Sequence, residues 1–505
     1  MFQAAARDVL ARARIDVGHL YAAAAPDGTP GQIRYVIWSE VLRTPCCDSE
    51  VSFYEAAARL APASIESAFV CAHCEMRLRV DQCERVVETV LDSVTGERFE
   101  QRLRVPVRVY GRSASATWSR GPTPEDLRIL GLVPVRPVDW VPTDEVGWGD
   151  LYRSGYHQGI SRFHHFYTQR NLAVLARLWA LVTEHPNAAV RKALQVWVLS
   201  YNASHSTLLS RVVAKRAQKD LVVTGAQSGV LYVSGLPVEK NIIDGLDRKI
   251  RTLHEAFSLT FASRSTVEIT CGSSTRLHLA DDAVDYVFTD PPFGAYIPYA
   301  EINQINEAWL GHLSDRSSEV IVSPAQDKTV REYGRLLAKV FSEVSRVLKQ
   351  DGCATVVFHA SKPAVWEALG EAFASNGLSV DQTSILDKRQ VTFKQVVSEG
   401  GTRDDAVFLL SHGHRPQSCE SPLSCSRAQP DTAEAVRGLV RAAAGRTSEL
   451  SAQRMWSRFA AESIRAGLEV PMGTHEFYGL IKQHQSTSLR TLSVPATLNP
   501  SRAPT

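Results

Sequence analysis

The sequence predicts an α/β protein that contains a mostly parallel sheet, an inserted β module and helical accessory regions. Three observations predict this fold class. Short β-rich runs alternate with helical stretches over 266–412, which is typical of parallel strands joined by helical crossovers. Two close pairs of cysteines lie among short strands and turns within 34–112. Helical patterns account for much of the remaining chain.

The composition is that of a globular protein with several domains. Of the 505 residues, 44% are hydrophobic and 22% are charged, as is ordinary for soluble proteins. This length is enough for about two to four domains. Apolar runs are shorter than the roughly 20 residues of a membrane span, and charged residues interrupt the N-terminal segment where a signal peptide would be apolar. We therefore expect a cytoplasmic location and no membrane contact.

The N-terminal part of the chain is predicted to contain a helix and then the β module. Apolar side chains among alanines predict the helix within 1–33, and RYVIWSEV (34–41) predicts a strand that leads to the first cysteine pair. The module continues over 34–112, where RLRVPVRVYG has the period-two alternation of a half-buried strand.

A connector and helical region is expected over 113–265. Prolines make its first part irregular, and two helices are predicted after it, over 171–185 and 188–217, separated at Pro186.

The region 266–412 is predicted to hold the main sheet. Its β-rich runs are VDYVFTD, CATVVFHA, LSVDQTSIL and DAVFLLS, and two helical stretches separate the first three. A linker is expected at 413–430, a helical region at 431–485 and a disordered tail at 486–505.

One motif in this region suggests chemistry. The strand VDYVFTD ends at Asp290, and Pro291, Pro292 and Phe293 follow it. Ligands bind at the carboxyl ends of strands in open α/β sheets. There a carboxylate and a backbone carbonyl can accept both N–H bonds of a base amino group, while proline fixes φ and an aromatic ring stacks on an extruded base. The alternative interpretation is a strand-ending turn with a buried aspartate.

The stretch VDYVFTDPPFGAYIPYAEINQINEAWLG (284–311) resembles the zinc-ribbon-containing, adenine-specific DNA methyltransferases of bacteria and archaea. The similarity continues in TGAQSGVLYVSGLPVEKN, HFYTQRNL, EYGRLLAKVFSEVSRVLKQDG, VVFHASKPAVW and LDKRQVTFKQ. It implies a partial Rossmann-like methyltransferase sheet with a zinc-ribbon-like module in 34–112. It also implies S-adenosylmethionine as the methyl donor, double-stranded DNA as the substrate and a role in restriction–modification or phage defence.

The resemblance gives the motif residues roles. Asp290 and the Pro291 carbonyl would hold the amino group, Pro292 would complete the rigid turn and Phe293 would stack on the base. Adenine N6 is the expected target, with cytosine N4 left open. Three further residues continue the motif and are explained equally well by helix packing and capping: Glu301, Asn303 and Trp309.

The cysteines of the β module suggest a zinc site, because four thiolates in two pairs hold zinc tetrahedrally. The resemblance implies that Cys71 and Cys74 form one pair and that Cys47 belongs to the other, where Thr44 replaces the usual first cysteine. The residue that completes the set is left open: Cys46, His73 or Cys83. We expect adjacent cysteines to share one metal poorly, so zinc at Cys46, Cys47, Cys71 and Cys74 competes with a module that has lost its metal.

A glycine-rich loop that would bind the methionine end of S-adenosylmethionine is missing from the sequence. In CGSS (271–274), Ser273 stands where related enzymes often carry an acidic residue near the cofactor adenine, so Ser273 and Asp290 are candidate cofactor contacts. The β-rich runs also account for only the later strands of a complete methyltransferase sheet. We therefore expect either a second polypeptide that carries the glycine-rich motif or a truncated gene.

Two basic clusters allow two interpretations, a solvated surface or contact with DNA phosphates. These clusters are Arg102, Arg104, Arg108 and Arg112, and Arg211, Lys215, Arg216 and Lys219. Two other functions also stay open. The chain could be a non-catalytic, DNA-binding or regulatory remnant, which the missing glycine loop favours. It could also methylate guanine amino groups of RNA, which the extended resemblance disfavours.

Overall fold

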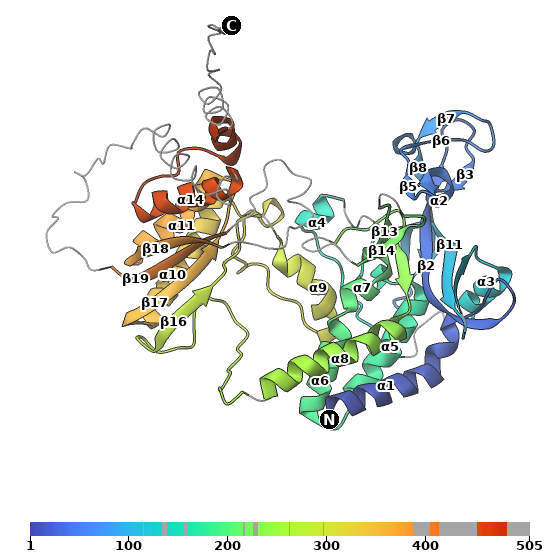
Figure 1. The fold of residues 1–505 in the computed structure, drawn as a ribbon, viewed down its shortest axis with the longest axis horizontal. Helices are drawn as coiled ribbons and strands as arrows, with labels where there is room; N and C mark the ends of the chain where they lie inside the picture. The colour runs from blue at the N-terminus through green and yellow to red at the C-terminus, as the bar shows by residue number, and fades with distance from the viewer. Residues whose placement is uncertain are drawn as a thin grey trace, which may run out of the picture. The chain divides into compact units, whose positions relative to one another are not determined.

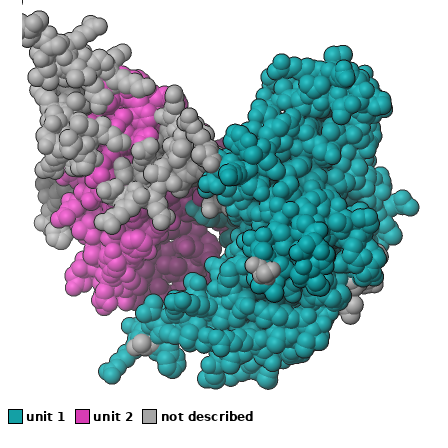
Figure 2. Space-filling model, turned by 45° about the vertical axis from the view of Figure 1, so that its right-hand side comes forward, with its two compact units in different colours: residues 1–267, 298–316 teal, residues 268–297, 317–505 magenta. Residues whose placement is uncertain are grey.

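The computed structural model describes most of the chain as two compact units. Unit 1 comprises residues 1–267 and 298–316, and unit 2 comprises 268–297 and 317–505 (Figure 2). The described residues are 1–114, 116–133, 139–155, 157, 159–215, 218–225, 231–261, 263–295, 297–386, 405–413 and 452–481. The expected tail at 486–505 lies outside them, as do the expected linker and the block LDKRQVTFKQ apart from the first residue of each.

The main sheet of unit 1 is organised around one long strand, β2 (Pro30–Arg43), whose centre is the predicted strand at 34–41 (Figure 1). All of its partners are antiparallel to it. They are β1 (Ala22–Ala24), β3 (Glu50–Ser52), β8 (Glu84–Arg85), β11 (Arg104–Arg112) and β15 (Val238–Lys240), and β12 (Thr117–Arg120) pairs with β11. β2 therefore ties the start of unit 1 to segments far away in the sequence.

The predicted β module is a set of short hairpins that extends from β2. It comprises α2 (Phe53–Ala57), β4 (Ala58–Arg59), β5 (Ser64–Ile65), β6 (Ala68–Val70), β7 (Arg77–Arg79), η2 (Val80–Gln82), β9 (Val87–Leu91) and β10 (Arg98–Arg102). β6 pairs with β7, and Leu42, Phe69 and Leu78 are buried together beneath the cysteines. Such a small core needs additional support, as small β modules generally do.

Four helices form the other core of unit 1: α1 (Phe2–Val17), α5 (Gln169–Thr183), α6 (Ala188–Leu199) and α8 (Ile242–Phe261). The predicted break at Pro186 falls between α5 and α6, but the predicted helix over 188–217 ends at Leu199. Shorter elements follow it because Ser and Asn side chains bond to nearby backbone groups, as Ser206 Oγ does to the Asn202 carbonyl. None of the described helices is long and apolar enough to cross a bilayer.

The remaining elements of unit 1 are shorter than these four helices, with the exception of α9. They are η1 (Gly18–Tyr21), α3 (Pro124–Gly131), α4 (Asp150–Arg153), η3 (Phe163–Phe166), α7 (Asn202–His205), η4 (Thr207–Leu209), β13 (Arg211–Val213), β14 (Val222–Thr224) and α9 (Tyr299–Leu310). α9 belongs to unit 1 although the strand before it belongs to unit 2.

Unit 2 is a mixed α/β unit with a four-stranded sheet in the order β16-β17-β19-β18 (Figure 1). Its strands are β16 (Val284–Thr289), β17 (Leu348–Phe358), β18 (Leu378–Leu386) and β19 (Asp405–His412). Its other described elements are η5 (Pro324–Gln326), α10 (Val330–Val347), α11 (Pro363–Ala374) and α14 (Ala452–Arg465). The four predicted β-rich runs and both predicted helices correspond to these elements.

The expectation of a mostly parallel sheet holds for strand direction but not for strand pairing. β16, β17 and β18 run in the same direction, and β19 alone is reversed between β17 and β18, so that β16–β17, joined by α10, is the parallel pair and the other two pairs are antiparallel. The strand β19 enters between its neighbours from the opposite direction, which the composition of a strand does not encode.

The two faces of the unit 2 sheet differ in burial. Ala354, Val356 and Phe358 of β17 are fully buried in a core that they share with α10, α11 and α14. On the opposite face, Tyr286 and Phe288 of β16 remain 51% and 64% exposed. Among the described residues, β16 also forms one edge of the sheet.

Candidate functional site

The Asp290–Phe293 motif forms a loop at the carboxyl end of β16. Asp290 directly follows the strand and is exposed, whereas Pro291 is buried. The carbonyl of Pro292 accepts a hydrogen bond of 2.7 Å from the hydroxyl of Tyr333, a residue of α10 that is fully buried. The alternative interpretation required a buried aspartate, and the exposure of Asp290 does not agree with it.

Gly294 fixes the path of the chain immediately after the motif. Its φ of +71° lies in the left-handed region that favours glycine. A Cβ atom at this position would also meet Cγ2 of Val365 at 3.2 Å, and the Gly294 carbonyl accepts from the N–H of Val322 at 3.4 Å. The C-terminal part of the loop is therefore held in place, at Pro292 and at Gly294.

Phe293 packs against two residues at the end of β17. Its ring meets Phe358 edge-on with centroids 5.3 Å apart, and it lies 4.1 Å from the ring of His359. His359 in turn pairs through Nδ1 with the Asp405 carboxylate at 2.8 Å, and both residues are about 5–6% exposed. One side of the Phe293 ring is thus fixed by the protein, and the residue as a whole is only partly buried.

His359 and Asp405 were missed by the sequence reasoning. Both lie at the end of the sheet where β16 leads into Asp290, because His359 follows the parallel strand β17 and Asp405 begins the antiparallel strand β19. The available signal was a polar residue near the end of CATVVFHA, His359, and another at the start of DAVFLLS, Asp405. Predicting that the two residues meet required the direction of β19, which the sequence pattern does not give.

The cofactor contacts predicted from the sequence are only partly accounted for. Ser273 lies in a stretch before β16 that has no helix or strand, and its hydroxyl is 2.8 Å from that of Thr275. Within the described part of unit 2, β16 is the first strand, and no strand followed by a glycine-rich loop precedes it. The described residues therefore do not fit the methionine end of S-adenosylmethionine.

Glu301 and Trp309 of α9 are buried in unit 1. The Glu301 carboxylate accepts from the N–H groups of Asp150 and Leu151 at 2.8 and 3.0 Å and pairs with Arg316 at 3.3 Å. A Cβ at Gly149 would meet this carboxylate at 2.4 Å, so only glycine allows the close approach. Trp309 is 2% exposed.

These contacts favour packing over catalysis for both residues. The indole N–H of Trp309 donates to the Tyr167 hydroxyl at 3.1 Å, and its ring meets Trp179 edge-on. Asn303, in contrast, is exposed on α9.

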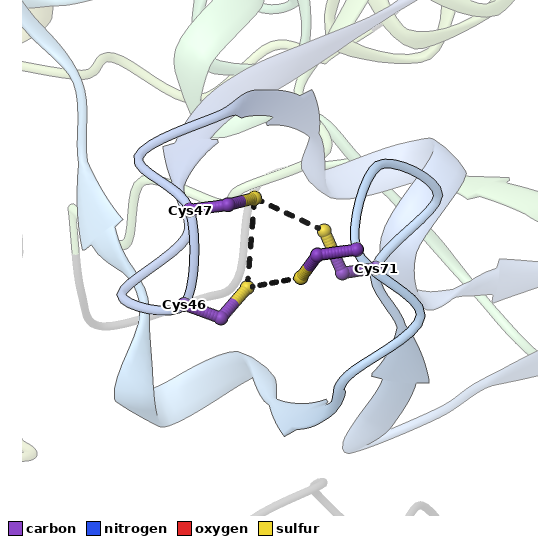
Figure 3. Close-up of side chains that lie close together, drawn as sticks. Cys46, Cys47 and Cys71 are labelled. Carbon is purple, nitrogen blue, oxygen red and sulfur yellow. Dashed lines mark hydrogen bonds between the residues drawn. The ribbon is translucent and has the colours of Figure 1, made fainter.

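The four cysteines of the predicted zinc site lie together. Their sulfur atoms are all within 4.8 Å of one another, and Figure 3 shows Cys46, Cys47 and Cys71 pointing toward a common centre. The Cys46–Cys47 and Cys47–Cys71 sulfur pairs are each 3.7 Å apart, and Cys74 lies 3.1 Å from Cys46. The adjacent Cys46 and Cys47 thus lie in one cluster with Cys71 and Cys74, and their sharing of one metal stays a prediction.

The spacing of the four sulfur atoms fits zinc, and two of the four thiols have lowered pKa values. Bonds of about 2.3 Å in a tetrahedral site place sulfur atoms about 3.8 Å apart. The backbone N–H groups of Cys74 and His73 lower the pKa of Cys71 to about 5, and the hydroxyls of Ser49 and Thr44 lower the pKa of Cys47. Thiolates are the form that binds metal.

Two other residues near the predicted site have different contacts. The thiol of Cys83, one of the residues left open, is directed to the carbonyl of Arg79 at 3.6 Å. Thr44, which replaces the usual first cysteine, contacts Cys47 through its hydroxyl. Of the three open residues, Cys46 belongs to the cluster of potential ligand atoms, whereas His73 and Cys83 do not.

The first basic cluster is largely engaged in ion pairs. Arg102 and Arg104, together with Arg85, surround the buried carboxylate of Glu40 and line a cavity of about 220 Å³. Of the remaining members, Arg112 pairs with Asp244 and Arg108 bonds to Ser119.

The second basic cluster is more open. Lys215 and Lys219 are exposed, Arg211 lies over the ring of Tyr232, and Arg216 is outside the described residues. The second cluster is therefore the better candidate for contact with phosphates.

Comparisons with known proteins leave the family of this chain undetermined. No protein-family model and no curated protein matches it. A solved structure titled PvuII DNA methyltransferase (cytosine-N4-specific) is 11% identical in sequence and aligns with a TM-score of 0.20. The alignment covers 42% of this chain and 90% of that one. A score this low supports no conclusion about fold or function.

Proposed function

We propose that this chain is the base-binding component of a DNA amino-methyltransferase that acts on adenine N6 with S-adenosylmethionine as methyl donor. The observation that carries the proposal is the exposed Asp290 at the carboxyl end of β16, in a diproline loop that Tyr333 and Gly294 hold in place. A restriction–modification or phage-defence system is the setting that we propose for it.

The motif suits an exocyclic amino group because the nitrogen lone pair of such a group is delocalised into the base. Acceptance of both N–H bonds by the Asp290 carboxylate and the Pro291 carbonyl localises that lone pair. Phe293 would stack on the extruded base, and His359, itself paired with Asp405, supports the Phe293 ring. The same geometry serves cytosine N4, so the substrate assay must include both bases.

We further propose that a second polypeptide completes the site. Sheets with parallel strands and helical crossovers are normally covered on both faces, yet Tyr286 and Phe288 are largely exposed. The free edge of β16 and these two rings are where a strand with a glycine-rich loop would pair. That partner would hold the methyl donor, because the described residues of this chain lack the loop.

DNA contact and zinc belong to the same proposal. Lys215 and Lys219 would contact phosphates, which position a protein on DNA without specifying sequence.

Zinc held by Cys46, Cys47, Cys71 and Cys74 would stabilise the hairpins above the small core of the β module. Replacing Cys71 and Cys74 by serine is expected to remove one equivalent of zinc from the purified chain, and equal zinc contents of the substituted and unsubstituted chains contradict this part.

The decisive experiment is a methylation assay with the complete complex. The chain is co-purified with the product of a neighbouring gene that carries the glycine-rich motif, and transfer of labelled methyl groups to DNA is measured. Asp290→Ala is expected to abolish transfer, whereas Asp381→Ala, at an exposed aspartate of β18, is expected to leave it unchanged. Equal activity of the Asp290→Ala complex would contradict the assigned site.

Calorimetry separates the partner from the chemistry. The chain alone is expected to bind S-adenosylmethionine weakly, and tight binding by the isolated chain would contradict the two-chain arrangement without affecting the role of Asp290.

The same methylation assay tests the two other functions, a non-catalytic regulatory remnant and an RNA guanine amino-methyltransferase. A complex that binds DNA and shows no transfer to DNA or RNA would identify a regulatory remnant. Transfer to ribosomal RNA instead of DNA would identify a guanine amino-methyltransferase.

A further inference from the structure

We infer that unit 1 contains a second metal site, formed by Asp92, His164 and His165, that takes a divalent transition ion such as Zn²⁺ or Fe²⁺. The Nε2 atoms of the two histidines lie 3.0 and 3.2 Å from the same oxygen, Oδ2 of Asp92. The potential ligand atoms of all three residues are within 4.8 Å of one another. The inference is independent of the proposed methyltransferase function.

The local structure fixes Asp92 before any ion binds. Asp92 lies in the turn between β9 and β10, where its Oδ1 accepts from the N–H of Val94 at 2.8 Å and its Oδ2 accepts from the Thr95 hydroxyl at 2.9 Å. Only 6% of the residue is exposed. A carboxylate held in this way loses little further freedom on coordination, which favours metal binding.

The two histidines are consecutive residues of η3, and both are oriented by neighbours. Nδ1 of His164 lies 3.1 Å from the carbonyl of Pro142. The ring of His165 stacks on that of Phe99, with ring centroids 3.9 Å apart and an angle of 6° between the ring planes. Nδ1 of His165 lies 3.3 Å from both the Ser161 hydroxyl and the N–H of Arg162. At His164 the remote nitrogen meets a backbone carbonyl, the usual support of a metal-binding histidine, whereas at His165 it accepts from a backbone N–H.

The remote nitrogens of the two rings have different partners. The Pro142 carbonyl can only accept, so Nδ1 of His164 donates to it and Nε2 faces Asp92. Nδ1 of His165 accepts from the N–H of Arg162, so Nε2 of His165 donates to Asp92 in the ion-free protein. Coordination through Nε2 of His165 therefore requires this proton to leave Nε2, as metal binding generally releases protons from its ligands.

A neighbouring cavity gives room for an ion and its further ligands. The three residues line a cavity of about 330 Å³ whose walls include Trp38, Leu172 and Arg104. A purely structural ion pair needs no such space. Two imidazoles and one carboxylate leave coordination positions open, as in catalytic zinc sites and in non-haem iron centres, and a water or a small oxyanion could occupy the cavity side.

Metal analysis of the full-length chain tests the inference. After loading with Zn²⁺ and dialysis, His164→Gln and Asp92→Asn are each expected to hold one equivalent less than the unsubstituted chain. His254→Gln, at an exposed histidine of α8, is the matched control and is expected to hold the full amount. Equal zinc contents in all of these proteins would overturn the inference, whatever the four cysteines bind.

A second measurement applies even where these variants do not fold. The cysteines of the unsubstituted chain are blocked with a thiol reagent, and Co²⁺ is titrated in. Saturable visible absorption without thiolate-to-cobalt charge transfer is expected. If Co²⁺ gives no saturable signal, the cluster is only a protonated His–Asp pair.

Discussion

Two carboxylates of the same sequence motif, Asp290 and Glu301, have opposite environments. Glu301 is buried in unit 1 and accepts two backbone N–H bonds as well as an ion pair with Arg316. Asp290, in unit 2, is exposed at the end of a strand. The comparison teaches that proximity in a motif does not indicate a shared role. A carboxylate whose oxygens are satisfied internally holds the fold, and an exposed one can meet a substrate.

The largest expected effect comes from Glu301. Glu301→Ala removes the acceptor of two backbone N–H groups and one partner of Arg316, so we expect the free energy of unfolding of unit 1 to fall by about 3 kcal/mol. Asp290→Ala should change the free energy of unfolding of unit 2 by less than about 0.5 kcal/mol. Urea unfolding of both variants measures the difference, and equal losses would break the comparison.

Acidification should lower the free energy of unfolding of unit 1 by an amount similar to that expected for Glu301→Ala. Burial lowers the pKa of His157 to about 4 from its ordinary 6.5, and neither ring nitrogen has a hydrogen-bond partner among the described residues. The stability from the neutral ring is complete above pH 6.5 and is lost as the pH falls to 4, at a cost of about 3 kcal/mol.

Urea unfolding at pH 7 and pH 4 measures this effect. His157→Phe keeps an aromatic ring beside Tyr152 and cannot bind a proton. The variant should therefore lose less stability on acidification than the unsubstituted chain, and identical pH profiles would show that His157 does not contribute.

A smaller effect is expected from the anchor of the Asp290 loop. Tyr333→Phe removes the hydrogen bond to the Pro292 carbonyl and should cost unit 2 about 1 kcal/mol. In the complete complex, methyl transfer should also fall, because the loop is less well positioned. Unchanged transfer with reduced stability would limit Tyr333 to a role in folding.

The smallest effect is expected from Asn303, which is exposed on α9. Asn303→Ala should change the stability by less than about 0.5 kcal/mol and leave methyl transfer intact. Loss of transfer in a stable variant would reveal a direct role for this residue.

Local features were the ones that could be predicted from the sequence. The strand before Asp290, the helices α10 and α11 and the break at Pro186 follow from hydrophobic periodicity and proline chemistry, which act over a few residues. The direction of β19 could not be predicted, since both directions need the same alternating side chains. For the same reason the pairing of His359 with Asp405 was missed.

Two further features depend on side-chain geometry rather than on spacing. Cys46 joins Cys47 in one cluster because the short turn that carries them directs both sulfur atoms to the same side. Asp92 meets His164 and His165 through segments distant in the sequence, and no motif announces such a convergence.

The free edge of β16 also has a consequence inside the cell. Among the described residues, β16 is an edge strand with two exposed aromatic rings, and such a strand is a template for pairing with other chains, including copies of itself. If the proposed partner normally covers this edge, the chain made alone should aggregate or be degraded. The genes for the two proposed subunits would then be kept, or lost, as a pair.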